Sequence, residues 1–134
     1  MSDEDIQELL MAAANAVENA YAPYSNFRVG SAVRTENGHV FAGCNVENAS
    51  YGLSNCAERS AIFRAVSSGH ASILGVAVVA ATGTLPYPCG ACRQVMSEFC
   101  PPSAPIYAAR LDLLDEYEMI TLGELLPKTF RLSP

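Results

Sequence analysis

Basic residues are scarce in this 134-residue sequence, which has two histidines and eight lysines and arginines, with Lys128 as its only lysine. The sequence also has no tryptophan. The 14 acidic residues outnumber the basic ones, so the formal net charge is −6 at pH 7. A polyanionic nucleic acid would meet long-range repulsion from such a protein unless a basic patch compensated. Because the sequence has no Lys/Arg cluster, we expect a small neutral ligand and no nucleic-acid partner.

Long hydrophobic runs are also missing. The longest apolar stretch, Ile73 to Ala81, is far shorter than the roughly 20 residues that a membrane-spanning helix needs. The acidic start, Met1 to Asp5, has no positively charged region leading into an apolar run, which argues against a signal peptide. We therefore expect a cytoplasmic protein without a membrane partner, folded as a single catalytic domain over residues 1–134.

Hydrophobic periodicity predicts a helix and a hairpin in the first third of the chain. Apolar residues recur every three or four positions from Ile6 to Tyr21, which is typical of a helix with one buried face. Pro23 ends that pattern. The segments Phe27–Thr35 and His39–Asn45 then flank Glu36-Asn37-Gly38, a sequence that favours positive φ and indicates a tight hairpin.

Strands and helices alternate along the rest of the chain. We expect helices over Cys56–Gly69 and Cys89–Phe99, a short helix after the capping box Thr121–Glu124, and strands over Ile73–Ala81, Ile106–Ala109 and Tyr117–Ile120. Such alternation predicts an α/β domain with three α/β/α layers and a mixed five-stranded sheet. We expect only the first strand pair to be a tight hairpin, with the later crossovers favouring parallel pairing.

The five cysteines indicate metal binding, because an odd number of thiols in a reducing compartment argues against a disulfide framework. Cys89 and Cys92 stand three residues apart at a predicted helix start, although such a pair could also be a redox pair or half of a structural zinc site. Cys56 begins another helix, and three thiolates would leave the fourth zinc position open for chemistry. Cys44 and Cys100 are interpreted as buried small hydrophobic residues.

An acidic residue accompanies the predicted metal ligands. Glu58 lies two residues after Cys56, in the first turn of an otherwise apolar helix. It could simply stabilise the helix dipole, a contribution of up to about 1 kcal/mol. Beside an open metal site it could instead carry protons.

These motifs resemble a known family. The runs Cys56-Ala57-Glu58 and Pro88-Cys89-Gly90-Ala91-Cys92 are similar to the zinc deaminase signature in the form where cysteine replaces the histidine ligand. Three flanking runs are similar to the short-chain, homotetrameric cytidine deaminases: Tyr21-Ala22-Pro23-Tyr24-Ser25-Asn26-Phe27-Arg28-Val29-Gly30, Gly43-Cys44-Asn45-Val46-Glu47-Asn48-Ala49-Ser50-Tyr51 and Gly123-Glu124-Leu125-Leu126-Pro127.

The resemblance implies a cytidine-deaminase-like fold and a zinc-dependent hydrolase of cyclic amidines. It implies one Zn²⁺ per chain, held by Cys56, Cys89 and Cys92, and hydrolysis of cytidine and 2′-deoxycytidine to uridine and 2′-deoxyuridine with release of ammonia, a reaction of pyrimidine salvage. Glu58 would move protons from water to N3 and to the leaving amine, and Arg59 would donate hydrogen bonds to the thiolate ligands.

The resemblance also implies a nucleoside pocket. It assigns Asn45 and Glu47 to the ribose 3′-hydroxyl, for which an amide and a carboxylate supply donor and acceptor. Phe27 would stack on the base, and the backbone N–H of Ala57 would donate to the base O2. Two further residues, Tyr51 and Phe130, would reach the pocket of a neighbouring subunit in a homotetramer.

Three other functions stay open at the level of sequence. A polynucleotide deaminase of cytosine or adenine would share the zinc chemistry but would need to grip phosphates, against which the acidic balance argues. A non-catalytic zinc module closed by four thiolates, with Cys44 as the fourth, would leave Glu58 without a task. A deaminase of cytosine-containing antibiotics is disfavoured by the intact sugar motif Asn45-Val46-Glu47.

Overall fold

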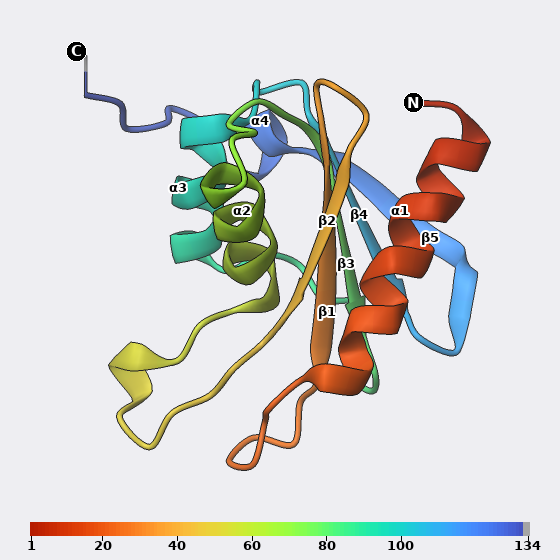
Figure 1. The fold of residues 1–134 in the computed structure, drawn as a ribbon, viewed down its shortest axis with the longest axis vertical. Coiled ribbons are helices and arrows are strands. Elements are labelled where there is room, and N and C mark those ends of the chain that lie inside the picture. The colour runs from red at the N-terminus through yellow and green to blue at the C-terminus, as the bar shows by residue number, and fades with distance from the viewer. Residues whose placement is uncertain (133–134) are drawn as a thin grey trace.

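The computed structural model describes residues 1–132 and contains a five-stranded mixed sheet between two helical layers. Figure 1 shows α1 on one face of the sheet and α2 with α3 on the other. The strand order is β2-β1-β3-β4-β5. The longer helices are α1 (Asp3–Ala16), α2 (Ala57–Ser67) and α3 (Gly90–Phe99), and the strands are β1 (Val29–Thr35), β2 (Val40–Cys44), β3 (Ile73–Ala80), β4 (Pro105–Arg110) and β5 (Leu113–Thr121). This architecture confirms the predicted three-layer α/β fold.

Helix α1 covers one face of the sheet with the apolar stripe predicted from its sequence. Ser2 caps its start, because the Ser2 hydroxyl accepts from the Asp5 N–H while the Asp5 carboxylate accepts from the Ser2 N–H. The helix ends at Ala16, earlier than predicted, and continues as a 3₁₀ turn over 17–19. At that end Arg28 donates to two carbonyl groups of the turn, which satisfies backbone acceptors that the helix leaves free.

Strand β3 lies in the middle of the sheet. It pairs antiparallel with β1 and parallel with β4, and every residue from Gly75 to Ala80 is buried. The predicted hairpin between β1 and β2 is present, with Gly38 at a φ of 81° in its turn. Parallel pairing after a helical crossover therefore holds for β3 and β4.

The edge of the sheet formed by β5 differs from the sequence-based expectation. Strand β5 pairs antiparallel with β4 through a second tight hairpin, and it runs over Leu113–Thr121 instead of a short segment near 117–120. An edge strand needs only one hydrogen-bonding neighbour and exposes its outer side chains, so acidic residues such as Asp115 and Glu116 are tolerated there. Those charges hide the hydrophobic alternation that reveals a strand in the sequence.

Helices α2 and α3 lie next to each other on the second face of the sheet (Figure 1). Helix α2 ends as predicted, with Gly69 at a φ of 94° directly after its last turn. The predicted capping box is present in α4 (Leu122–Leu125), where Thr121 and Glu124 satisfy each other's backbone N–H groups. None of the helices in residues 1–132 combines the length and the apolar composition of a membrane span.

Candidate metal centre and substrate cavity

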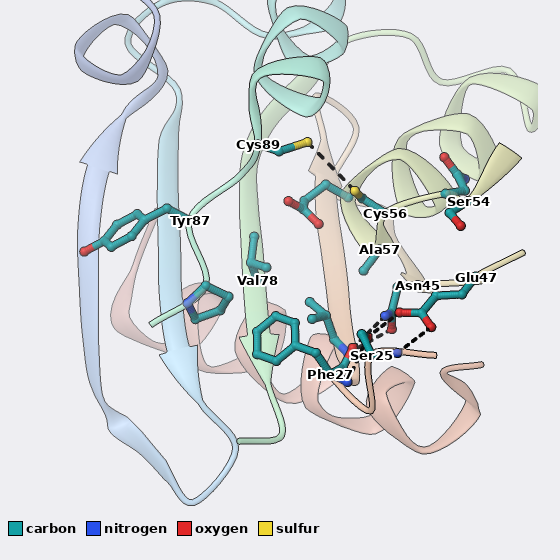
Figure 2. A pocket seen from close by; sticks show the side chains of 14 residues that line it. Ser25, Phe27, Asn45, Glu47, Ser54, Cys56, Ala57, Val78, Tyr87 and Cys89 are labelled. Atoms are coloured by element: carbon teal, nitrogen blue, oxygen red, sulfur yellow. Dashed lines mark hydrogen bonds between the residues drawn. The ribbon is translucent and has the colours of Figure 1, made fainter. Parts of the chain in front are cut away.

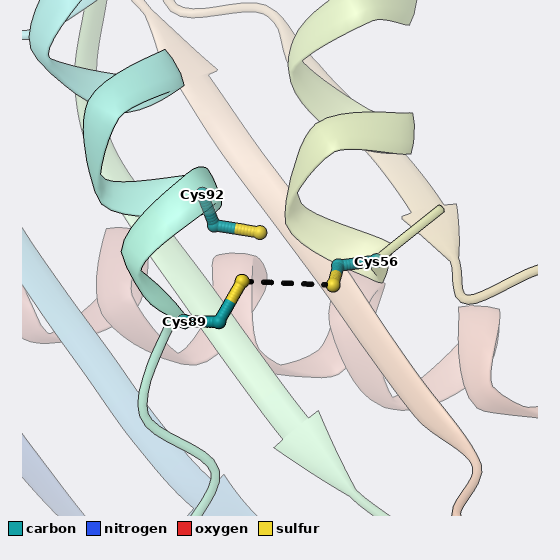
Figure 3. A group of neighbouring side chains, drawn as sticks. All are labelled: Cys56, Cys89 and Cys92. Atoms are coloured by element: carbon teal, nitrogen blue, oxygen red, sulfur yellow. Dashed lines mark hydrogen bonds between the residues drawn. The ribbon is translucent and has the colours of Figure 1, made fainter. Parts of the chain in front are cut away.

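Three thiols meet where α2 and α3 begin. Cys56 and Cys89 are the residues that directly precede the two helices, and Cys92 lies in the first turn of α3 (Figure 3). Their Sγ atoms all lie within 4.8 Å of one another, with Cys56 and Cys89 3.9 Å apart. Tetrahedral zinc–thiolate bonds of about 2.3 Å would set a sulfur–sulfur separation of about 3.8 Å, so this cluster fits zinc.

No fourth protein ligand joins this cluster in the described part of the chain. Among residues 1–132, the only group of three or more potential metal ligands is Cys56, Cys89 and Cys92. Cys44, which a closed four-thiolate module would need, ends strand β2 and lies outside the group. It is half-buried, whereas Cys100 is buried as predicted. Three ligands leave the fourth tetrahedral position for a molecule from outside the chain.

The surroundings favour negative charge on the Cys56 thiol. A hydrogen bond with Cys92 and further bonds from Arg59 and Cys89 lower the pKa of the Cys56 thiol to about 5. The same hydrogen bond with Cys56, together with burial, raises the pKa of Cys92, which therefore keeps the shared proton. The Arg59 guanidinium donates from Nη2 to Cys56 Sγ over 3.2 Å. Cys56 and Cys89 also stand at the starts of α2 and α3, where the positive ends of the helix dipoles stabilise thiolate charge.

Glu58 is an acid placed where water barely reaches. Only 5% of its surface is exposed, and burial raises the pKa of its carboxyl group to about 7, with the nearby Cys56 thiolate adding to the effect. A surface acid that merely stabilised a helix dipole would not bear this desolvation penalty. A carboxyl group with a pKa near 7 can both accept and release a proton at neutral pH.

A cavity of about 300 Å³ opens beside the thiols (Figure 2). Its lining includes seven of the residues predicted from the sequence: Phe27, Asn45, Glu47, Cys56, Ala57, Glu58 and Cys89. These residues come from the loop before β1, the segment after β2, the start of α2 and the start of α3. The cavity therefore brings a metal-binding cluster, a proton carrier and polar hydrogen-bonding groups to one place.

Asn45 and Glu47 are held rigidly in the wall of this cavity. The side chain of Asn45 accepts from the Val29 N–H over 2.9 Å and donates to the Phe27 carbonyl over 2.8 Å. Glu47 accepts from the Ser25 N–H over 3.1 Å and from the Ser25 hydroxyl, and these bonds help to lower the pKa of its carboxyl group. Glu47 is therefore a preorganised anion at neutral pH.

Phe27 is fixed by the same network. Its N–H donates to Ser25 Oγ over 3.0 Å, and its carbonyl accepts from Asn45. Both backbone polar groups of Phe27 are thus bound by residues that belong to the same cavity wall. Figure 2 shows the ring of Phe27 in the cavity wall, across from Ala57 at the start of α2.

The start of α2 leaves backbone donors available. No side chain caps this helix, although Ala57 itself is fully buried and lines the cavity. Free N–H groups at a helix start are suited to a carbonyl oxygen or an anion of a ligand.

Tyr51 and Phe130 lie outside the lining of this cavity. They are 77% and 66% exposed, which is unusual for aromatic side chains. Tyr51 borders a neighbouring hollow together with Glu47 and Ser25. The backbone carbonyl of Phe130 accepts from the side chain of Gln94 on α3. Within one chain, neither aromatic residue completes the cavity.

Several lining residues were not predicted from the sequence. Ser25 stands in a run that resembles the deaminase family, but its bonds to Glu47 and Phe27 need the folded loop. Val78, Pro86 and Tyr87 also line the cavity. Val78 belongs to a uniformly apolar strand, so its sequence carries no functional signal, and the two residues from the 82–88 loop become visible only once that loop is placed.

Fold and site together define an α/β protein whose three-thiol cluster, suited to zinc, opens into a small-molecule cavity. Residues 3–108 match the family model described as the cytidine and deoxycytidylate deaminase zinc-binding region. The chain belongs to this deaminase family.

Similar proteins agree with this assignment over nearly the whole chain. The cytidine deaminase of Halalkalibacterium halodurans is 49% identical over 126 residues, which cover 94% of each chain. The crystal structure of a cytidine deaminase from Burkholderia pseudomallei has a TM-score of 0.87 and 46% identity, covering 97% of this chain and 100% of that one. For a cytidine deaminase from Mycobacterium tuberculosis the values are a TM-score of 0.79, 37% identity and coverages of 98% and 100%.

Proposed function

We propose that the protein hydrolyses cytidine and 2′-deoxycytidine to uridine and 2′-deoxyuridine and releases ammonia. The observation that carries this proposal is the opening of the Cys56–Cys89–Cys92 cluster, with Glu58 beside it, into a cavity lined by Phe27, Asn45 and Glu47. The names of the similar proteins support the same activity.

The chemistry divides between the metal and the chain. Cys56, Cys89 and Cys92 would hold a zinc ion, which would lower the pKa of a water molecule so that it could attack the base near neutral pH. Glu58 takes one proton from the attacking water and delivers it to N3 of the base. It then transfers the second proton, from the hydroxyl group formed on C4, to the amino group, which leaves as ammonia when the bond between C4 and the amino nitrogen breaks. One water is consumed, and its oxygen becomes the carbonyl oxygen of the uracil ring.

The rest of the cavity wall orients the nucleoside. Asn45 and Glu47 bind the ribose 3′-hydroxyl as donor and acceptor, Phe27 stacks on the base, and the Ala57 N–H donates to O2. Because these groups are already fixed by hydrogen bonds, binding requires little ordering of the protein. None of them contacts a 2′-hydroxyl in this arrangement, which is why ribo- and deoxyribonucleosides both serve as substrates.

The assembly and location of the protein belong to the same proposal. We propose a cytoplasmic homotetramer whose chains each form one catalytic domain over residues 1–134 and take part in pyrimidine salvage. Tyr51 and Phe130, exposed on the single chain, would complete the pockets of neighbouring subunits.

Purified protein and its Glu58→Gln variant, assayed with a nucleoside panel, test the activity. The wild type should release ammonia from cytidine and 2′-deoxycytidine. Release from 3′-deoxycytidine should be much slower, because the missing 3′-hydroxyl leaves Asn45 and Glu47 without a partner. The variant should keep one zinc per chain and lose at least about 10²-fold in turnover, because the geometry survives while proton transfer does not. Activity on single-stranded nucleic acid with none on nucleosides would refute the proposal.

A further inference from the structure

A loop with few attachments forms one wall of the substrate cavity. Residues 82–88 connect β3 to α3, and Pro86 and Tyr87 of this loop line the cavity. Its ends are held, because the Ala81 N–H donates to the Arg28 carbonyl and the Pro88 carbonyl accepts from Arg93. Between these ends, no backbone group of 82–87 forms a hydrogen bond within residues 1–132.

The sequence of the loop explains this lack of attachments. Pro86 and Pro88 have no N–H to donate, and they flank Tyr87 on both sides. Residues 82–87 also contain no helix or strand that would fix them through a backbone ladder. The position of the cavity wall at Pro86 must therefore depend on side-chain contacts.

Tyr87 provides such a contact across the sheet. Its hydroxyl donates a hydrogen bond to the Glu118 carboxylate on β5, and this bond raises the pKa of Tyr87. Figure 2 shows the Tyr87 ring directed away from Cys56 and Phe27, toward the blue strand at the far edge of the sheet. The hydroxyl end of the side chain thus points away from the cavity, although Tyr87 is one of its lining residues.

The sheet register places Glu118 where this reach is possible. Val78 on β3 is opposite Ala108 on β4, and Ala108 is opposite Glu118 on β5, so the three side chains share one face of the sheet. Val78 lines the cavity, and Ala108 between them is fully buried and carries only a methyl group. Tyr87 therefore spans from the cavity wall to the edge strand over the smallest residue of the row.

We propose that Tyr87 and Glu118 form a clasp that positions the Pro86 side of the cavity for nucleoside binding. Both are positioning residues, since the hydroxyl and carboxylate lie away from the metal cluster. This inference rests on the proposed deaminase function. Because Arg93 holds Pro88 separately, the clasp acts on substrate binding and leaves the Cys89 ligand in place.

Kinetics of four variants test the clasp on the zinc-loaded enzyme. Tyr87→Phe and Glu118→Ala should each raise KM for cytidine roughly 3- to 10-fold, the range that one hydrogen bond covers, with kcat within about twofold of wild type. Glu118→Gln should show a smaller rise, because its amide oxygen still accepts the bond. The double variant Tyr87→Phe/Glu118→Ala should be no worse than the worse single variant.

Controls separate the clasp from charge, stability and the proposed activity itself. Glu116→Ala removes an acid from the same strand and should leave KM unchanged, while zinc content should stay at one per chain in every variant. Backbone NMR order parameters at Gly83, Thr84, Leu85 and Tyr87 should fall in Glu118→Ala and stay at wild-type values in Glu116→Ala. This readout needs no turnover, so it tests the clasp even if wild type fails to deaminate cytidine. Unchanged order parameters in Glu118→Ala, or KM effects that multiply in the double variant, would overturn the proposal.

Discussion

Glu58 and Arg59 are adjacent in the first turn of α2 and have opposite electrostatic roles. Glu58 is buried, which raises its pKa to about 7, while Arg59 stays cationic and donates to the Cys56 thiolate. Three thiolates and Zn²⁺ sum to one net negative charge, so an adjacent cation would stabilise the cluster by offsetting that charge. Successive residues on a helix point in different directions, so the proton carrier and the charge-balancing donor can occupy adjacent positions.

The charge role of Arg59 leads to a prediction. Replacing Arg59 with Gln should leave the fold intact but weaken zinc retention and lower kcat, each on the roughly 10- to 100-fold scale of groups that hydrogen-bond metal ligands. Zinc retention can be measured by competition with a chromophoric chelator, and kcat by loss of cytidine absorbance.

Arg64 offers a matched control on the same helix. It is exposed, and its Nη1 donates to the Ala42 carbonyl over 3.2 Å, away from the thiols. Arg64→Gln should change stability by no more than about half a kcal/mol and leave zinc retention and kcat near wild type. Equal losses in the two variants would show that Arg59 has no special role at the metal.

At the scale of elements, the site depends on how closely α2 approaches β2. Gly43 on β2 faces the middle of α2, where an added Cβ would lie 2.6 Å from the Ala61 nitrogen and 2.7 Å from Ser60 Cβ. Backbone atoms of α2 at Ser60 and Ala61 cannot shift alone without breaking the helix, so α2 would have to move as a unit away from the added Cβ. Cys56 and Glu58 lie about one turn before that contact and would move with it.

A Gly43→Ala substitution should therefore damage both stability and the site. We expect a loss of about 1–3 kcal/mol in the free energy of unfolding, typical of overpacking, together with weaker zinc binding and lower activity. Urea unfolding and chelator competition measure the two effects. Gly52→Ala is the control, because an added Cβ there meets nothing within 4 Å and should leave stability almost unchanged. A Gly43→Ala protein as stable as the Gly52→Ala protein would contradict the packing argument.

At the scale of the whole molecule, exposed aromatic residues such as Phe130 are suited to contact with another subunit. Phe130 lies near the end of the described chain, beyond α4, where Figure 1 shows the C-terminal segment running outward past α3. An aromatic side chain that is 66% exposed gains stability when another subunit covers it. In the proposed homotetramer of 14.3-kDa chains, Phe130 would complete a neighbour's pocket.

Mixing two impaired variants tests whether Phe130 acts on a neighbouring subunit. Phe130→Ala should raise KM, and Glu58→Gln should be nearly inactive while keeping Phe130. Refolding them together should place intact Phe130 beside pockets that retain Glu58, so activity per Glu58-containing chain should rise above that of Phe130→Ala alone.

The control mixture replaces the second partner by Glu58→Gln/Phe130→Ala, which has no intact Phe130 to offer. Its activity per Glu58-containing chain should stay at the Phe130→Ala level. Sedimentation should give the mass of four chains for each protein. Identical activity in the two mixtures, or a monomer in solution, would show that Phe130 serves its own chain or none.

Local features of the sequence were enough to predict most elements and the family. Helix starts at Cys56 and Cys89, the Gly38 turn, the capping box at Thr121 and the two cysteine motifs all depend on a few consecutive residues. Such signals survive in a linear sequence because hydrogen bonding, capping and turn preferences act over one to four positions. Strand β5 was predicted too short because edge strands tolerate charge and so lose their alternation.

Only the tertiary structure decided how distant residues meet. Cys56 and Cys89 are 33 positions apart in sequence, yet packing of α2 and α3 on one face of the sheet brings their sulfur atoms to 3.9 Å. The pKa of Glu58 rises because neighbouring elements exclude water from it, and Tyr87 finds Glu118 because three strands set the register between them. Residue types and local spacing determine which chemistry is available, whereas burial and long-range register, which are properties of the packed chain, determine where and how strongly it acts.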